Sequence, residues 1–263
     1  MSFSPTVCRA LAAACLASPL AASAASVSAI LYGVSDTPAA VSPGTNTLTI
    51  NLNGQVDSGA YVGQLNWHNA TSADWNDGLN PQLASILGPN ATFATYCIDV
   101  GQNVFFGQSS TWSYGALPLA ATPKPGAGMG ATQAGEVSEF WNRYYDLIGT
   151  GVGADVRATA FQLGLWELTN DGLGADPFSS GTFMASAPGG DPSAITLATQ
   201  WLGDVGGTTP YVNQYTLYTL ADDGLQDQVF AVRATPLPSA GTMGLSALGA
   251  MALATQLRRK RIA

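Results

Sequence analysis

The sequence has 263 residues, of which only 10% are charged, and its 17 acidic residues outnumber the 9 basic ones. A low charge combined with 30 glycines excludes a charge-rich disordered chain and is typical of a β-rich extracellular protein with many tight turns. Most of the basic residues lie near the two ends, so the central body is strongly acidic, which excludes nucleic acid and anionic membrane surfaces as its partners.

Residues 1–24 have the three parts of a secretory signal peptide in the expected order. Arg9 supplies the positive charge, residues 10–20 form a short apolar segment, and Ala22-Ser23-Ala24 is an A-x-A cleavage site. We therefore expect the chain to be exported and its body to span residues 25–234.

The mature chain is expected to have one cysteine and one histidine, because Cys8 and Cys15 leave with the signal peptide. The remaining Cys97 cannot form an intramolecular disulfide, so it pairs with another chain, stays free or has a chemical role. His68 alone excludes a multi-histidine zinc site, as well as any Ser-His-Asp or Cys-His centre that does not use it. The sequence predicts no metal site and no cofactor.

Alternating apolar residues predict antiparallel strands in both flanks of the body. The expected strand regions are 26–34, 45–56, 61–67, 92–106, 214–220 and 228–234. In the second of these, Leu48, Ile50, Leu52 and Val56 would share one face, and Asp57-Ser58-Gly59 would form the turn that follows.

A long polar loop, residues 69–89, carries Asp74 and Asp77. Acidic residues in such a loop are candidates for calcium binding, but their spacing is not that of an EF-hand. A solvated turn is the simpler interpretation, and the sequence leaves calcium binding open.

Between the strands, residues 130–203 have helical patterns. The residues of the first helix that share an apolar stripe are Val137, Phe140, Trp141, Tyr144, Leu147 and Ile148. A second helix, N-capped by Asp155, would carry Gln162 and end at Asn170-Asp171-Gly172, and a third would run from Ser193 to Leu202. The predicted fold class is α+β, an antiparallel β sandwich or barrel with an inserted helical subdomain.

Two short motifs carry the candidate chemistry: Tyr96-Cys97-Ile98 on a strand and Gln162-Leu163-Gly164-Leu165-Trp166 on a helix. A buried thiolate that meets a carboxamide can displace ammonia and leave an intramolecular thioester, which is a stored acyl group. Alternation places Cys97 on the opposite strand face from Tyr96 and Ile98. Small residues one turn before Gln162 would let the strand approach, and Trp166 one turn after it would screen the bond from water.

In these motifs the body resembles the thioester domains of bacterial surface proteins. The resemblance implies only that Cys97 and Gln162 form the bond. Tyr96 and Trp166, which lie beside these two residues in the motifs, are candidate shielding residues. The chain departs from the family in having Gly164 where alanine is usual. The implied function is covalent adhesion by single-turnover acyl transfer to an amine on a surface or matrix, not multiple-turnover catalysis. Asp99 is a further candidate, as a group that activates Cys97.

Structural interpretations compete with each of these assignments. Cys97 would be a buried thiol, Gln162 would form a capping box with Thr159, and Asp99 would be a solvent-facing strand residue. The alternative function is then a non-reactive exopolysaccharide or biofilm matrix protein that binds polysaccharide through Trp67, Trp75 and Trp112. A hydrolase is disfavoured, because Glu167 and Asp171 share a helix face but have no partner motif.

The C-terminal segment, residues 235–263, has a proline motif, an apolar stretch from Ala240 to Leu257 and a basic tail. Its motif residues are Pro236, Pro238, Arg258, Arg259, Lys260 and Arg261. This order resembles the PEP-CTERM sorting signal of Gram-negative bacteria, with Leu237 in place of the usual Glu. The resemblance implies transient insertion in the inner membrane, processing by an exosortase, and delivery to the cell surface or extracellular matrix.

Overall fold

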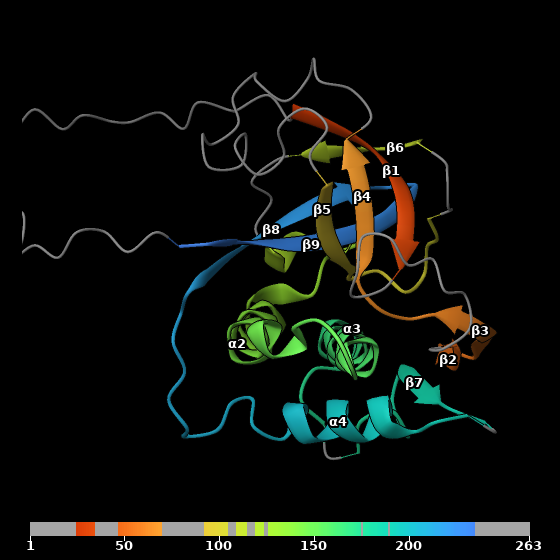
Figure 1. Ribbon diagram of the computed structural model, residues 1–263, viewed down its shortest axis with the longest axis vertical. Helices are drawn as coiled ribbons and strands as arrows, with labels where there is room; N and C mark the ends of the chain where they lie inside the picture. The colour runs from red at the N-terminus through yellow and green to blue at the C-terminus, as the bar shows by residue number, and fades with distance from the viewer. Residues whose placement is uncertain are drawn as a thin grey trace, which may run out of the picture.

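The computed structural model describes residues 25–34, 47–69, 92–104, 109–114, 119–123, 126–174, 176–188 and 190–234. The signal peptide, Asp74, Trp75, Asp77 and the C-terminal segment with Pro236, Pro238, Arg258, Arg259, Lys260 and Arg261 lie outside these residues. In the described part, a β-barrel sits on one side of three packed α-helices, and a small second sheet lies beside them (Figure 1). The predicted α+β class is confirmed.

Six antiparallel strands close the barrel in the order β1-β4-β5-β9-β8-β6. Their bounds are Ala25–Val34 for β1, Leu65–Asn69 for β4, Thr92–Cys97 for β5, Leu225–Arg233 for β9, Tyr215–Asp222 for β8 and Ser109–Tyr114 for β6. The β8–β9 hairpin has the longest ladder, whereas β5 pairs with β9 only at Tyr96 and Cys97. The β8–β9 hairpin therefore joins the earlier strands of the barrel through two short ladders, β5–β9 and β6–β8.

The second sheet has the order β3-β2-β7 and contains one correction to the predicted strands. Residues 45–56 are not one strand, because β2 (Thr47–Leu52) turns at Asn53-Gly54 into β3 (Gln55–Tyr61). Asn53 and Gly54 have φ values of 51° and 85°, as a two-residue Asn-Gly hairpin requires. Val56 therefore leaves the face predicted for it and is 61% exposed.

The segment first predicted as a turn, Asp57-Ser58-Gly59, lies within β3. Gly59 has a φ of 99° and is the extra residue of a β-bulge, since Leu48 pairs with Ala60 and Thr49 pairs with Ser58. The third strand, β7 (Phe183–Ser186), was not predicted, because its four residues lie in a stretch rich in Gly and Pro.

A short 3-10 helix, η1 (Leu119–Ala121), precedes the helices α2 (Gly130–Ile148), α3 (Ala154–Asn170) and α4 (Ser193–Leu202). The predicted apolar stripe of α2 is buried except for Leu147, which is 55% exposed. α3 begins after the left-handed Gly153, so Asp155 lies in its first turn and is not the N-cap that was predicted. The predicted end of α3 at Asn170 is confirmed.

α3 is the central element of the fold. Almost its whole length is buried, because α2, α4, β5 and β7 surround it. A Cβ at Gly164 would lie 2.2 Å from Phe140 Cζ, so the glycine lets α2 pack directly against α3. This contact gives a physical reason for glycine at position 164, because even an alanine would displace the Phe140 ring.

An aromatic cluster joins the barrel to the helices. Tyr96 of β5 packs edge-on against Phe161 of α3 and Trp141 of α2, with ring centroids 4.8 Å and 5.7 Å away. Such pairs stabilise a core beyond the area that they bury. They fix the end of β5 against α3, which places the residue after Tyr96 opposite the middle of that helix.

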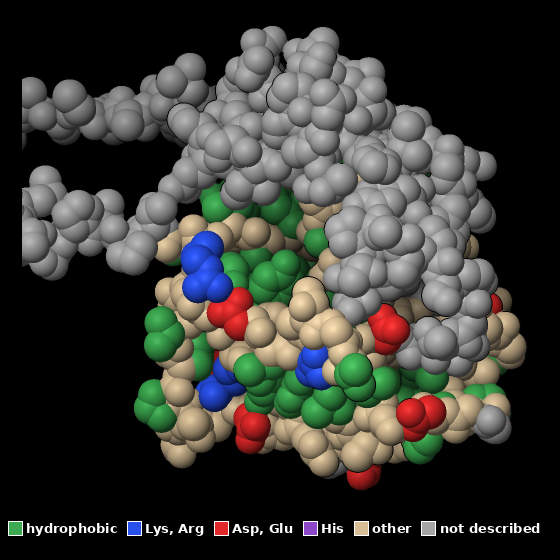
Figure 2. Space-filling model, viewed as in Figure 1, with side chains coloured by type: hydrophobic (Ala, Val, Ile, Leu, Met, Phe, Trp, Pro, Cys, Tyr) green, Lys and Arg blue, Asp and Glu red, His purple; other side chains and the backbone are tan. Residues whose placement is uncertain are grey.

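The described surface matches the low charge of the sequence. On the face shown in Figure 2, acidic and basic side chains are scattered among polar and apolar ones. Within the described residues, none of the helices is both long and apolar enough to span a bilayer.

Candidate functional site

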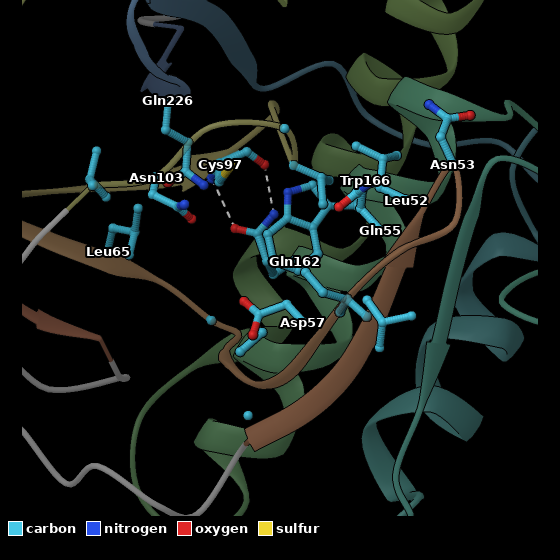
Figure 3. A pocket seen from close by; sticks show the side chains of 18 residues that line it. Leu52, Asn53, Gln55, Asp57, Leu65, Cys97, Asn103, Gln162, Trp166 and Gln226 are labelled. Carbon is cyan, nitrogen blue, oxygen red and sulfur yellow. Dashed lines mark hydrogen bonds between the residues drawn. The ribbon is translucent and has the colours of Figure 1, made fainter.

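The candidate site lies where β5 loses one of its neighbouring strands. The β4–β5 ladder ends at the pair Leu65–Thr95, so the backbone of Cys97 has no strand partner on the β4 side. Gln162 of α3 fills this position: its Oε1 accepts a hydrogen bond from Cys97 N at 2.8 Å, and its Nε2 donates one to Cys97 O at 2.6 Å. Figure 3 shows both bonds. The structure thus brings Cys97 and Gln162 together across 65 residues of sequence.

This pairing has a structural and a chemical consequence. It satisfies two buried backbone groups that would otherwise be unpaired, since Gln162 is only 1% exposed. It also holds the Gln162 carboxamide beside the backbone of Cys97, so the carbon that a thiolate would attack lies next to the residue that carries the thiol. The capping-box interpretation of Gln162 is wrong, because Thr159 lies inside α3 and its hydroxyl donates to Val62 O.

Cys97 is a free and buried thiol. Its Sγ donates a hydrogen bond to the carbonyl oxygen of Asp99 at 2.9 Å. Burial raises the pKa of the thiol well above its ordinary value, and the nearby Asp99 carboxylate raises it further, whereas the Trp166 indole lowers it. The indole N–H lies outside hydrogen-bond geometry with any described acceptor, so its effect on the thiol is that of a nearby donor. The thiol is therefore protonated at rest, although the Trp166 indole and the Asp99 backbone lower its pKa and so favour ionisation.

Asp99 is not the solvent-facing strand residue of the structural interpretation. β5 ends at Cys97, and Asp99 lies buried in the segment that follows. Its Oδ1 accepts a hydrogen bond from Gly101 N at 2.8 Å, while its buried Oδ2 has no hydrogen-bond partner among the described residues. Burial raises the pKa of this carboxyl, which makes it a stronger base than an ordinary aspartate.

Cys97, Gln162 and Trp166 line one pocket of about 750 Å³ (Figure 3). The β2–β3 hairpin forms a second wall, and the chain after β5, including Asn103, forms a third. A pocket of this size admits a small nucleophile or a side chain of a larger molecule. The hairpin wall was missed in the sequence analysis, although Asn53-Gly54 is the signal that would have placed it.

Two aromatic residues do not lie where their expected roles, shielding of the thioester and polysaccharide binding, would require. Tyr96 is not part of the pocket wall, since its ring belongs to the aromatic cluster and its hydroxyl donates to Gln64 Oε1 at 3.4 Å. Trp67 is fully buried and its indole N–H donates to Thr95 Oγ1, so it presents no surface to a polysaccharide. The side chain of Trp112 is not described.

Glu167 and Asp171 hold a loop, and neither lines the pocket that contains Cys97. Asp171 accepts hydrogen bonds from the backbone N–H groups of Thr182 and Phe183, both at 2.8 Å, and Glu167 Oε2 accepts one from Phe178 N at 3.3 Å. The two carboxylates thus attach the segment before β7 to the end of α3. No cluster of three or more His, Cys, Asp or Glu side chains that could hold a metal occurs among the described residues.

Glu167 gives the fold a pH dependence. Burial raises its pKa from 4.5 to about 7. Between pH 4.5 and pH 7 the folded protein therefore keeps a proton on Glu167 that the unfolded chain has released. Its contribution to stability is therefore complete below pH 4.5 and is lost as the pH rises through 7. We expect the free energy of unfolding to fall by about 2 kcal/mol across this range in the wild type, relative to Glu167→Gln. Urea unfolding at pH 4.5 and pH 8 measures the difference. The same change in unfolding free energy between the two pH values in both proteins would contradict the prediction.

Comparisons with known proteins add no assignment. No family model matches the chain, and neither a curated protein nor a solved structure is significantly similar to it. The function proposed below therefore rests on the residues of this chain and on their geometry.

Proposed function

We propose that the chain is an exported surface protein whose body stores an acyl group as a thioester between Cys97 Sγ and Gln162 Cδ. The observation that carries this proposal is the pair of hydrogen bonds between the Gln162 carboxamide and the Cys97 backbone, next to the buried free thiol and at the wall of an accessible pocket. The stored group would be transferred once, to a primary amine on a neighbouring surface or matrix.

Formation of the bond uses groups that are already in place. The thiolate of Cys97 attacks Gln162 Cδ, and the negative charge that develops on Oε1 is stabilised by Cys97 N–H, which already donates to that atom. The C–N bond then breaks, and Nε2 takes up the proton released by the thiol and leaves as ammonia. Asp99 is the base closest in sequence to the thiol, and its raised pKa and unpartnered Oδ2 suit the transfer of that proton.

In acyl transfer the Cys97 sulfur is the leaving group, whereas in thioester formation it is the nucleophile. An amine that enters the pocket attacks the thioester carbonyl carbon, the C–S bond breaks, and the amine proton passes to the Cys97 sulfur. The product is an amide between Gln162 and the target together with a free thiol. Trp166 covers the bond from the helix side and limits the access of water until an amine arrives.

The two ends of the chain support a surface location for this chemistry. The signal peptide and the C-terminal proline motif, apolar stretch and basic tail suit export, transient insertion in the inner membrane, and processing by an exosortase-type enzyme. We propose a final location on the surface or in the extracellular matrix of a Gram-negative cell.

A second candidate is a non-reactive matrix protein with the same fold. The observation that favours it is that Gln162 completes the backbone hydrogen bonds of β5, a role that needs no chemistry. The burial of Trp67 removes one of the three tryptophans proposed for polysaccharide binding.

The intact mass of the purified protein decides between the two candidates. With the thioester present, the mature chain weighs one ammonia less than its sequence and has no titratable thiol. Added methylamine then raises the mass by one methylamine and exposes one thiol per chain. Cys97→Ala and Gln162→Ala each abolish both effects. A wild-type protein with full sequence mass and one thiol that titrates on unfolding, after preparation without amines, would instead establish the non-reactive candidate.

A further inference from the structure

The pocket that contains Cys97 and Gln162 has an uneven distribution of charge. Among its described lining residues the single ionisable group besides the thiol is Asp57, and there is no lysine or arginine. Most of the other polar side chains in the wall are uncharged amides, such as those of Asn53, Gln55 and Asn103. An entering molecule therefore meets one negative charge that no basic residue of the wall balances.

The position of Asp57 is fixed by the hairpin. Asp57 lies within β3 and pairs with Ile50 of β2, whose side chain is buried. Alternation along β3 places Gln55 and Asp57 on one face, and both line the pocket together with Leu52 and Ile50, the β2 residues with which they pair. Figure 3 shows the Asp57 side chain on the side of the pocket that faces the Gln162 carboxamide.

We infer that Asp57 is a specificity-determining residue that makes the pocket select amines without an adjacent negative charge, such as the lysine side chain of a protein, and reject anionic amines. The physical reason is the charge that develops during attack. Addition of an amine to a thioester makes its nitrogen positive and the carbonyl oxygen negative. Cys97 N–H faces the oxygen, and Asp57 supplies a negative charge on the other side of the pocket. A nucleophile that carries its own carboxylate is repelled by Asp57 before it arrives.

This inference rests on the proposed thioester, and its test separates the two. Glycinamide and glycine present the same primary amine and differ in the charge of the neighbouring group. The rate of thiol release is measured with each amine, corrected for its fraction of free base, for the wild type, Asp57→Asn and Asp176→Asn. Asp176 is an exposed carboxylate outside the pocket wall, so its substitution changes the net charge equally.

We expect the wild type to prefer glycinamide, and Asp57→Asn to lower the ratio of the two rates about three- to tenfold. Asp176→Asn should leave the ratio unchanged, and the effect of Asp57 should weaken at high salt, because Asp57 is exposed. The intact mass of each unreacted protein is read in parallel. A mass one ammonia low with an unchanged ratio in Asp57→Asn overturns the role of Asp57 alone, whereas a full sequence mass overturns the thioester and this inference with it.

Discussion

Gln162→Glu is expected to retain its full sequence mass at every pH and to add a second pH dependence of stability to that of Glu167. A carboxylate is a far poorer acyl donor to a thiolate than a carboxamide, so no thioester forms. The new side chain also lacks the Nε2 donor that bonds Cys97 O at 2.6 Å, and an ionised oxygen there would face the carbonyl oxygen directly. Folding therefore favours the protonated acid, whose O–H can donate to the same carbonyl.

The sign of the pH effect follows from this preference. The folded-state pKa of the new glutamate lies above that of an unfolded glutamate. Its contribution to the stability of the protein is therefore fully present below about pH 4.3 and is lost as the pH rises through the folded-state pKa. We expect a loss of about 2–5 kcal/mol at pH 8, since one buried group loses its partner and a charge is buried. Urea unfolding in the Cys97→Ala background, which cannot form the bond in any variant, measures this change as the difference between Gln162→Glu and the Gln162 parent at each pH, because the pH dependence of Glu167 is common to both.

Gln162→Leu provides the matched control in the same background. It removes both hydrogen bonds and leaves two buried backbone groups unpaired, so it should be destabilised to a similar extent but equally at both pH values. A Gln162→Glu protein whose loss of stability relative to the Gln162 parent is the same at pH 8 as at pH 4 would show that the carboxamide does not hold Cys97 in solution as it does in the structure.

The order of the elements could be predicted from the sequence because period and local signals agree there. The three helices fall within residues 130–202, where apolar spacing and terminating glycines support each other. The proximity of Cys97 and Gln162 was also predicted, from the two motifs and from the strand and helix faces on which the two residues were expected to lie. Nothing local in the sequence indicates that the Gln162 side chain replaces a strand beside β5, because that depends on where the β4–β5 ladder ends.

The errors have two physical origins, a misplaced turn and an unknown buried face. The Asn53-Gly54 turn was passed over in favour of a turn at Asp57-Ser58-Gly59, although Gly59 serves a bulge and not a turn. That error hid the hairpin wall of the pocket and with it the role proposed for Asp57. The burial of Asp99 and Trp67 could not be read from alternation alone, because strand periodicity distinguishes two faces without saying which of them is covered.

Trp166→Ala is expected to have the second large effect, on both stability and the lifetime of the thioester. Trp166 is buried beside the pocket and packs edge-on against Phe183, with ring centroids 5.8 Å apart. Removing the ring costs about 3–5 kcal/mol through lost packing and a cavity. The cavity opens into the pocket and admits water, which would hydrolyse the thioester to a carboxylate at position 162 and a free thiol. Intact mass should then show a protein one water heavier than the thioester form.

Two further variants separate shielding from stability and from the indole N–H. Trp201→Ala removes another buried indole, which stacks on Tyr144 at 4.8 Å outside the pocket wall, so it should cost similar stability without faster hydrolysis. Trp166→Phe keeps an aromatic ring but removes the donor that favours the Cys97 thiolate, so its thioester should form more slowly and then persist. Equal hydrolysis in Trp166→Ala and Trp201→Ala would assign the loss to destabilisation and remove the shielding role from Trp166. Hydrolysis in Trp166→Ala alone would show that the indole keeps water from the stored acyl group until an amine reaches it.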